Sequence, residues 1–139
     1  GCRQVEVTTR RTKGDFVQFI GHLVKKVYVR ARKIHLVLDN LNTHFRSSFE
    51  EILGVKEATQ MLERVEFHYT PKHASWLNMA EIEIGIMDRQ CTGCRIPNEQ
   101  TIRAEVAAWT DRRTQAKSTI DWKFTRQDAD QKLPRHYVS

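Results

Sequence analysis

Two carboxylates beside apolar segments are the residues of this chain best suited to chemistry. Asp39 follows the apolar run of residues 34–38, and Glu81 lies in an apolar segment that follows the polar loop of residues 71–78. A buried strand that ends at an acid places it at the carboxyl edge of an α/β sheet, where ligands bind. Paired carboxylates suit a hard divalent cation, because Mg²⁺ and Mn²⁺ prefer oxygen ligands. The pattern therefore predicts a site for Mg²⁺ or Mn²⁺.

The elements before Glu81 alternate between strand and helix patterns. Residues 3–10 alternate like a late hairpin strand, and an apolar stripe with helical spacing follows them, from Phe16 to Tyr28. After the strand that ends at Asp39, the sequence predicts two short helices divided by Gly54, over residues 47–53 and 56–63, and a strand over 65–69. Because helices connect the two strands, we expect the strands to be parallel, with a right-handed crossover.

The remaining elements are predicted to be mainly helical. A helix over about residues 77–90 is apolar on most sides, so we expect it to be largely buried. Asn98 is a candidate N-cap for a helix that runs to about Arg112. Trp122 and Phe124 alternate with charges, as in a short edge segment, and Thr125 to Asp128 resembles a capping box that begins a last helix.

The apolar helix carries two acids, and the pattern of residues alone does not choose between them. Glu81 and Glu83 lie two positions apart, which is about 200° around a helix. Only one of them can therefore face Asp39. An acid on so apolar a helix needs a partner, because burying an unpaired charge is costly.

Three motifs, in this order, resemble the catalytic domain of bacterial DDE transposases. They are residues 37–44 (VLDNLNTH), 67–81 (FHYTPKHASWLNMAE) and 121–125 (DWKFT). The resemblance is to the insertion-sequence group called IS six-thirty, a relative of the mariner transposases, and it extends roughly from Gln4 to Tyr137. It implies an α/β fold of the ribonuclease H-like type and a single partial DDE domain over residues 1–139.

By this resemblance Asp39 matches the second acid of the DDE triad and Glu81 the third, with Glu83 as the weaker alternative. The first acid belongs to an earlier strand than the segment with which this chain begins. Asp15 is the only aspartate before Asp39, and we interpret it as an acid in the first turn of a helix rather than as a metal ligand. We therefore expect an N-terminally truncated domain that lacks the first strands of the sheet.

The function implied is metal-dependent cleavage and strand transfer of DNA, with transposon ends and target DNA as partners. Without the first acid, we expect the isolated chain to be inactive. An alternative is a non-enzymatic remnant that binds DNA or pairs with a transposase, either as a homodimer or with a full-length enzyme. A third interpretation, another nuclease on the same fold, is weaker because the Ser75-Trp76-Leu77-Asn78 motif is typical of transposases.

Composition agrees with these expectations. The chain has 23 Lys and Arg against 17 Asp and Glu, a formal net charge of +6, which favours a polyanionic partner such as DNA. Three cysteines do not make a disulfide framework, and no apolar run reaches membrane-spanning length, so we expect a cytoplasmic bacterial protein.

Four polar residues near the two acids are candidate auxiliary residues: Asn40, His44, His73 and Asn78. The two histidines either contact a phosphate or a metal-bound water, or hydrogen-bond within their own loops. Trp76 either stacks on a flipped base or fills the core. Cys91 and Cys94 have CxxC spacing, but no second pair completes a structural zinc site, so we expect reduced thiols.

Overall fold

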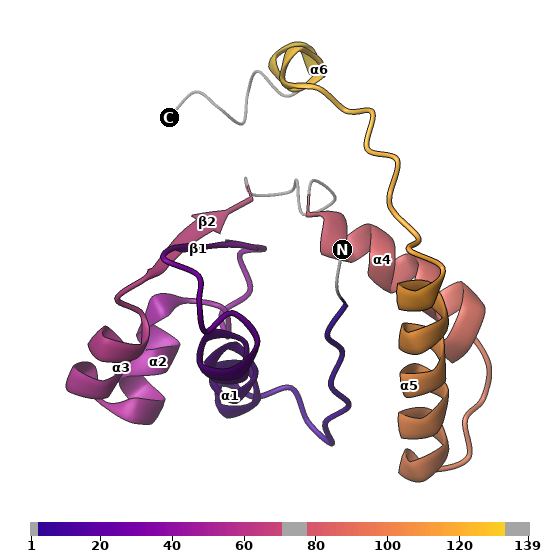
Figure 1. Ribbon diagram of the computed structural model, residues 1–139, viewed down its shortest axis with the longest axis horizontal. Helices are drawn as coiled ribbons and strands as arrows, with labels where there is room; N and C mark the ends of the chain where they lie inside the picture. The colour runs from indigo at the N-terminus through magenta and orange to yellow at the C-terminus, as the bar shows by residue number, and fades with distance from the viewer. Residues whose placement is uncertain (1–2, 71–77, 133–139) are drawn as a thin grey trace. The chain divides into compact units, whose positions relative to one another are not determined.

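The computed structural model describes residues 3–70 and 78–132, and the chain divides into two compact units. Residues Thr8–Asn78 form the first, which we call the strand unit. Gly1–Val7 and Met79–Ser139 together form the second, which we call the helical unit (Figure 1). The strand unit contains α1 (Lys13–His22), η1 (Leu23–Val27), β1 (Ile34–Leu38), α2 (Arg46–Leu53), α3 (Val55–Met61) and β2 (Val65–Tyr69). The helical unit contains α4 (Met79–Met87), η3 (Asp88–Thr92), α5 (Glu99–Gln115) and α6 (Arg126–Lys132).

Helix α1 begins at a reciprocal capping box. The Thr12 side chain accepts a hydrogen bond from the Asp15 backbone N–H, and the Asp15 side chain accepts one from the Thr12 N–H at 2.8 Å. These bonds confirm the interpretation of Asp15 as an acid in the first turn of a helix. They also lower the pKa of Asp15, through the side-chain and then the backbone hydrogen bond with Thr12, against a smaller opposing effect of burial.

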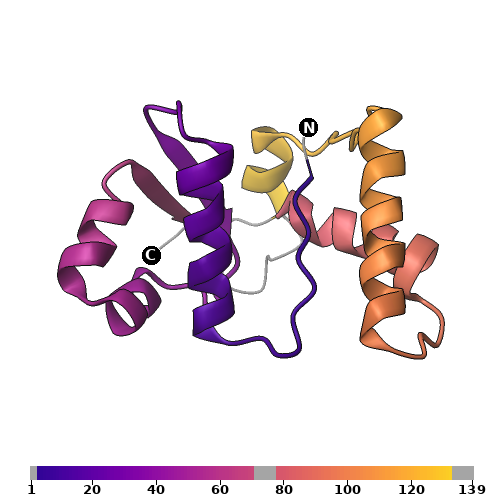
Figure 2. The ribbon, with the colours of Figure 1, turned by 60° about the horizontal axis from the view of Figure 1, so that its bottom comes forward.

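The strand unit has one hydrophobic core, to which α1, η1, α2, α3 and β2 all contribute. Phe49 of α2 is fully buried, and its ring contacts both Phe16 and Phe67 edge-on, with centroids 5.5 and 5.9 Å apart. The buried residues of this core are Val17, Ile20, Val24, Phe49, Ala58, Met61, Leu62 and Val65. The predicted apolar stripe therefore packs in this core as far as Val24, whereas Tyr28 at its end is 42% exposed. Figure 2 shows α1 lying in front of the strands.

Strands β1 and β2 pair in parallel, as the connecting helices predict. Ile34 is opposite Val65 and Leu38 is opposite Tyr69 in the register. Ile34 and Leu36 pack on the core, while Val37, which alternates with them, is 53% exposed. One face of the sheet is thus covered by the helices of this unit, and the opposite face carries exposed side chains.

Arg64, which directly precedes β2, hydrogen-bonds to the segment that leads into β1. Its guanidinium donates to the backbone carbonyls of Val24, Val29 and Ala31, so it links the first turn of η1 to the segment before β1. Its own carbonyl accepts from the Ile34 N–H at 2.8 Å. Arg64 therefore holds the residues before β1 through its side chain and the first residue of β1 through its backbone carbonyl.

Gly54 separates α2 from α3, as the sequence predicts. Its φ of 80° lies in the region that glycine reaches without strain, and its carbonyl accepts the first bond of α3, from the Ala58 N–H. The sharp turn lets both helices place apolar residues in the same core.

Two predictions about the helical unit are wrong. Residues 3–10 are not a strand, because no described strand pairs with them; Arg3 instead uses its side chain, donating to Glu83 and to the Ser118 carbonyl. Helix α4 has no buried residue, and its Ile84 is 55% exposed. Its apolar sequence predicted burial, but the contacts that the structure describes for it include polar ones, from Arg3 and from Arg113 of α5 to Glu83.

The C-terminal elements follow their predicted signals more closely. The Asn98 side chain accepts from the Thr101 N–H at 2.9 Å and caps α5, which buries Val106 and Trp109. Thr125 and Asp128 form the expected capping contacts before α6. Trp122 and Phe124 are not in a strand; their rings meet edge-on with centroids 6.1 Å apart. Within the described ranges no helix has the length and apolar character needed to cross a membrane.

Candidate metal-binding site

Asp39 lies at the carboxyl end of β1, next to the end of β2. The residue before it, Leu38, is 8% exposed, and its carbonyl accepts from the Thr70 N–H at 2.8 Å. Because the two strands are parallel, both carboxyl ends lie at the same edge of the sheet. Asn40 strengthens this edge, since its side-chain amide donates to the Thr70 carbonyl across the strands. The structure therefore places Asp39 where the sequence predicted it.

His44 contacts the Asp39 carboxylate directly. The turn after β1 closes through a bond from the His44 N–H to the Leu41 carbonyl, and His44 Nδ1 then lies 2.5 Å from Asp39 Oδ1. Both side chains are largely buried, at 22% and 18% exposed, and the imidazole packs on the Phe16 ring with centroids 4.6 Å apart. The Tyr69 hydroxyl donates to the His44 carbonyl. An imidazole in this position orients the carboxylate, as such groups do in outer shells of metal sites.

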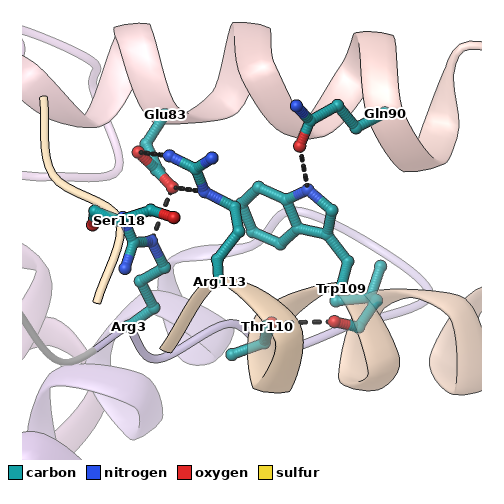
Figure 3. A network of polar contacts seen from close by, with 8 residues as sticks. Arg3, Glu83, Gln90, Trp109, Thr110, Arg113 and Ser118 are labelled. Carbon is teal, nitrogen blue, oxygen red and sulfur yellow. Dashed lines mark hydrogen bonds and ion pairs between the residues drawn. The ribbon is translucent and has the colours of Figure 1, made fainter. Parts of the chain in front are cut away.

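Glu81 and Glu83 of α4 have different surroundings. Glu81 lies in the first turn of α4 and is exposed. Glu83 accepts from Arg3 Nε at 2.5 Å, and from Arg113 Nε at 2.6 Å and Nη2 at 3.2 Å (Figure 3). Its side chain is 19% exposed, against 12% for Arg3 and 15% for Arg113. Glu83 is therefore neutralised by two cations, while Glu81 lies on a different side of the helix.

The surroundings of Glu83 also change its titration. Partial burial alone would raise the pKa of Glu83, but the hydrogen bonds and positive charges of Arg3 and Arg113 outweigh it and hold the pKa below its ordinary value. A carboxylate that already binds two guanidinium groups is a poor candidate for a metal ligand. This geometry favours Glu81 as the acid available for a metal ion.

A second contact fixes the orientation of α5 in the same unit. Trp109 is 2% exposed, and its indole N–H donates to the Gln90 side chain at 3.0 Å (Figure 3). The Arg113 guanidinium lies over the Trp109 ring, 5.5 Å from its centroid. The Trp109 ring therefore supports one face of the Arg113 guanidinium, whose N–H groups donate to Glu83.

For the remaining predicted site residues, the structure tests only part of the prediction. Asp39 belongs to the strand unit and Glu81 to the helical unit, so their convergence on one metal site stays a prediction. Asn78 is half-buried. His73, Ser75 and Trp76 lie outside the described residues, and the interpretations of them stay predictions.

Cys91 and Cys94 are free thiols, as expected. Burial raises the pKa of Cys91, and the nearby Glu105 carboxylate adds to this effect. A raised pKa keeps the thiol protonated near neutral pH, which argues against a nucleophilic role.

Sequence reasoning missed two features of the site region. Asn40 was treated as an auxiliary to the metal, but its described role is to join the ends of the two strands. Arg3 and Arg113 gave no signal as partners of Glu83, because they lie 80 and 30 residues away from it. The one relevant signal was the apolar character of α4. A partly buried acid on such a helix requires a positively charged or hydrogen-bonding partner.

Comparison with known families decides the assignment. The family described as DDE superfamily endonuclease matches residues 2–103, well over half of the sequence. The chain belongs to the DDE superfamily of endonucleases. The matched region contains Asp39 and both acids of α4, and this membership implies a ribonuclease H-like fold, with which the parallel strands and their helices agree. Neither the curated proteins nor the solved structures contained a match.

Members of the DDE superfamily generally use divalent metal ions and act on DNA. This domain is therefore of the transposase-type nuclease class. The carboxylate at the end of β1 fits such an ion, because it is an oxygen ligand, is largely buried and is already oriented by an imidazole.

Proposed function

We propose that this chain is a catalytic domain of a DDE transposase of the IS six-thirty group, with Asp39 and Glu81 as its metal ligands. The observation that carries the proposal is the position of Asp39 at the shared carboxyl edge of two parallel strands, inside the region matched by the family. Mg²⁺ or Mn²⁺ is the ion that two carboxylates would select. Transposon ends and target DNA are the substrates in this proposal.

The roles of the residues follow from their contacts. A bound ion would supply Lewis-acid stabilisation of the phosphate oxygens in an in-line displacement. Asp39 would bind the ion, and His44 would hold the carboxylate in one orientation through the Nδ1 contact. Asn40 would keep the ends of β1 and β2 together, so that Asp39 stays at the shared edge.

Glu81 is proposed as the second ligand because Glu83 is engaged elsewhere. Moving Glu83 to a metal ion would break its bonds to Arg3 and Arg113 and leave two partly buried cations without their carboxylate. Glu81 has no such cost, since it is exposed in the first turn of α4.

We also propose that this chain alone does not cleave DNA. The resemblance calls for a first acid that precedes Asp39, and Asp15, the only aspartate before Asp39 in this chain, is used in the cap of α1. Losing one member of a cooperating catalytic group generally costs nearly as much as losing the whole group. The alternative proposal is a non-enzymatic module that binds DNA or a transposase partner.

Mn²⁺ binding tests the metal site without requiring activity. Bound Mn²⁺ should broaden the NMR signals around both Asp39 and Glu81 in the unmodified chain. Asp39→Ala and Glu81→Gln should weaken that effect, while the matched control Glu83→Gln should retain it at temperatures where it is folded. Broadening that survives Asp39→Ala, or that is lost in Glu83→Gln but not in Glu81→Gln, would contradict the assignment.

A plasmid assay tests inactivity and the alternative. With Mn²⁺ and supercoiled plasmid we expect no nicking by the chain, and weak duplex binding that falls steeply as salt rises, because Lys and Arg contacts release counterions. Nicking that disappears in Asp39→Ala would refute the claim of inactivity. Binding of DNA without Mn²⁺ broadening at Asp39 would favour the non-enzymatic module.

A further inference from the structure

The exposed face of the sheet brings two histidines and a glutamate together. His35 of β1 is the register partner of Glu66 on β2, and His68 follows Glu66 by two residues on the same face. Each side chain offers one ligand atom, and these atoms all lie within 4.8 Å of one another. All three belong to the strand unit, so the cluster is defined within one pair of hydrogen-bonded strands.

The distances in this cluster are close to those of a tetrahedral metal site. His35 Nδ1 lies 3.0 Å from His68 Nε2, and Glu66 oxygens lie 3.8 Å from His35 Nδ1 and 3.6 Å from His68 Nε2. An ion with bonds of about 2.0–2.1 Å in tetrahedral geometry separates its ligand atoms by about 3.3–3.4 Å. The two Glu66 distances involve different oxygens, Oε2 for His35 and Oε1 for His68, and a single Glu66 oxygen lies within 4.8 Å of both nitrogens. Rotation of the Glu66 carboxylate, and separation of the two imidazoles that now hydrogen-bond each other, would bring the ligands into place.

We propose that His35, Glu66 and His68 form a binding site for a divalent transition-metal ion of the Zn²⁺ type. Two imidazole nitrogens and one carboxylate oxygen select such an ion over Mg²⁺, which prefers oxygen ligands alone. The side chains are 57%, 42% and 43% exposed, which leaves access for a water molecule as a fourth ligand. Lys33 also pairs with Glu66, so an ion would have to displace the Lys33 ammonium.

The site is separate from the proposed catalytic metal site. His35 lies on the exposed face of β1, whereas Asp39 follows the C-terminal end of that strand and contacts His44. An ion held by His35, Glu66 and His68 would join β1 to β2 through side chains as well as through the backbone. Because the carboxyl ends of these two strands carry Asp39 and Thr70, the ion would stabilise the edge on which Asp39 lies.

Cobalt and zinc titrations of the full chain test this proposal. The background is an untagged protein with Cys2, Cys91 and Cys94 replaced by serine, so that no thiol binds the metal. We expect saturable Co²⁺ binding with visible d–d absorption, displacement by Zn²⁺, no competition by excess Mg²⁺, and a rise in Tm on adding Zn²⁺.

Four variants make the test specific. His35→Ala and His68→Ala should each weaken Zn²⁺ binding by about tenfold or more, since loss even of an outer-shell partner costs about 10–100-fold. His22→Ala, an exposed histidine of α1 outside the cluster, and Asp39→Asn should both retain binding. Unchanged affinity in His35→Ala and His68→Ala, or loss of binding in His22→Ala or Asp39→Asn, would overturn the proposal. Retained Zn²⁺ binding with no Mn²⁺ effect at Asp39 would support this site while refuting the catalytic one.

Discussion

Replacing Glu83 by glutamine should destabilise the helical unit, whereas the same change at Glu81 should not. The Glu83 carboxylate accepts three hydrogen bonds from Arg3 and Arg113, and all three side chains are at least four-fifths buried. Glutamine keeps one oxygen acceptor, but it removes the charge and presents an N–H₂ group to the remaining guanidinium donors.

The expected magnitude follows from these contacts. A hydrogen bond to a charged group contributes about 1.5–3 kcal/mol, and breaking a buried ion pair costs about 3–5 kcal/mol. Since the glutamine side chain would retain part of the contact, we expect Glu83→Gln to lower the free energy of unfolding by about 2–4 kcal/mol. Glu81 is exposed, so Glu81→Gln should change it by no more than about 0.5 kcal/mol.

Urea unfolding of the three proteins measures this difference. Far-UV circular dichroism would follow the helices, and tryptophan fluorescence would report on the surroundings of the buried Trp109, which lies beside Arg113. Glu83→Gln should shift the midpoint to lower urea, and Glu81→Gln should follow the unmodified chain. A Glu83→Gln protein as stable as Glu81→Gln would refute the structural role of Glu83 and reopen its candidacy as a metal ligand.

Two further predictions concern pH and the core. Because the folded-state pKa of Glu83 is lowered, its contribution to stability is present above the unfolded pKa of about 4.3 and is lost as pH falls through the folded pKa. The stability difference between the unmodified chain and Glu83→Gln should therefore shrink below about pH 4.3 in urea titrations, and a constant difference would contradict the ion pair. Phe49→Ala should cost about 3–5 kcal/mol in the same assay, because Phe49 is fully buried; a loss under about 1 kcal/mol would show that the core refills the space.

The strand unit could be predicted well because its signals are local. These signals are a periodic apolar stripe, a glycine between two short helices, and two short apolar runs. Each can be recognised from residues that are neighbours in the sequence, and each corresponds to an element of the structure. The position of Asp39 follows from the same local logic, since the acid comes directly after the strand.

The helical unit was harder to predict because its decisive contacts join distant residues. Residues 3–10 alternate like a strand, but alternation cannot say whether a partner strand is present, and Arg3 binds Glu83 instead. The apolar sequence of α4 likewise predicted burial that the described contacts do not provide. The cluster of His35, Glu66 and His68 needed the register of β1 against β2, which no single segment of sequence contains.

The discontinuous make-up of the helical unit also bears on the order of events during synthesis. All elements of the strand unit lie between Thr8 and Asn78, so their contacts can form as soon as this segment leaves the ribosome. The ion pair between Arg3 and Glu83 closes a loop of 80 residues that contains the entire strand unit. Once the strand unit has folded, its compact structure brings the two ends of this loop closer together. Closing the loop then costs less conformational entropy than it would in an unfolded chain. The segment around Arg3 would therefore stay unattached until α4, α5 and Ser118 have all been made.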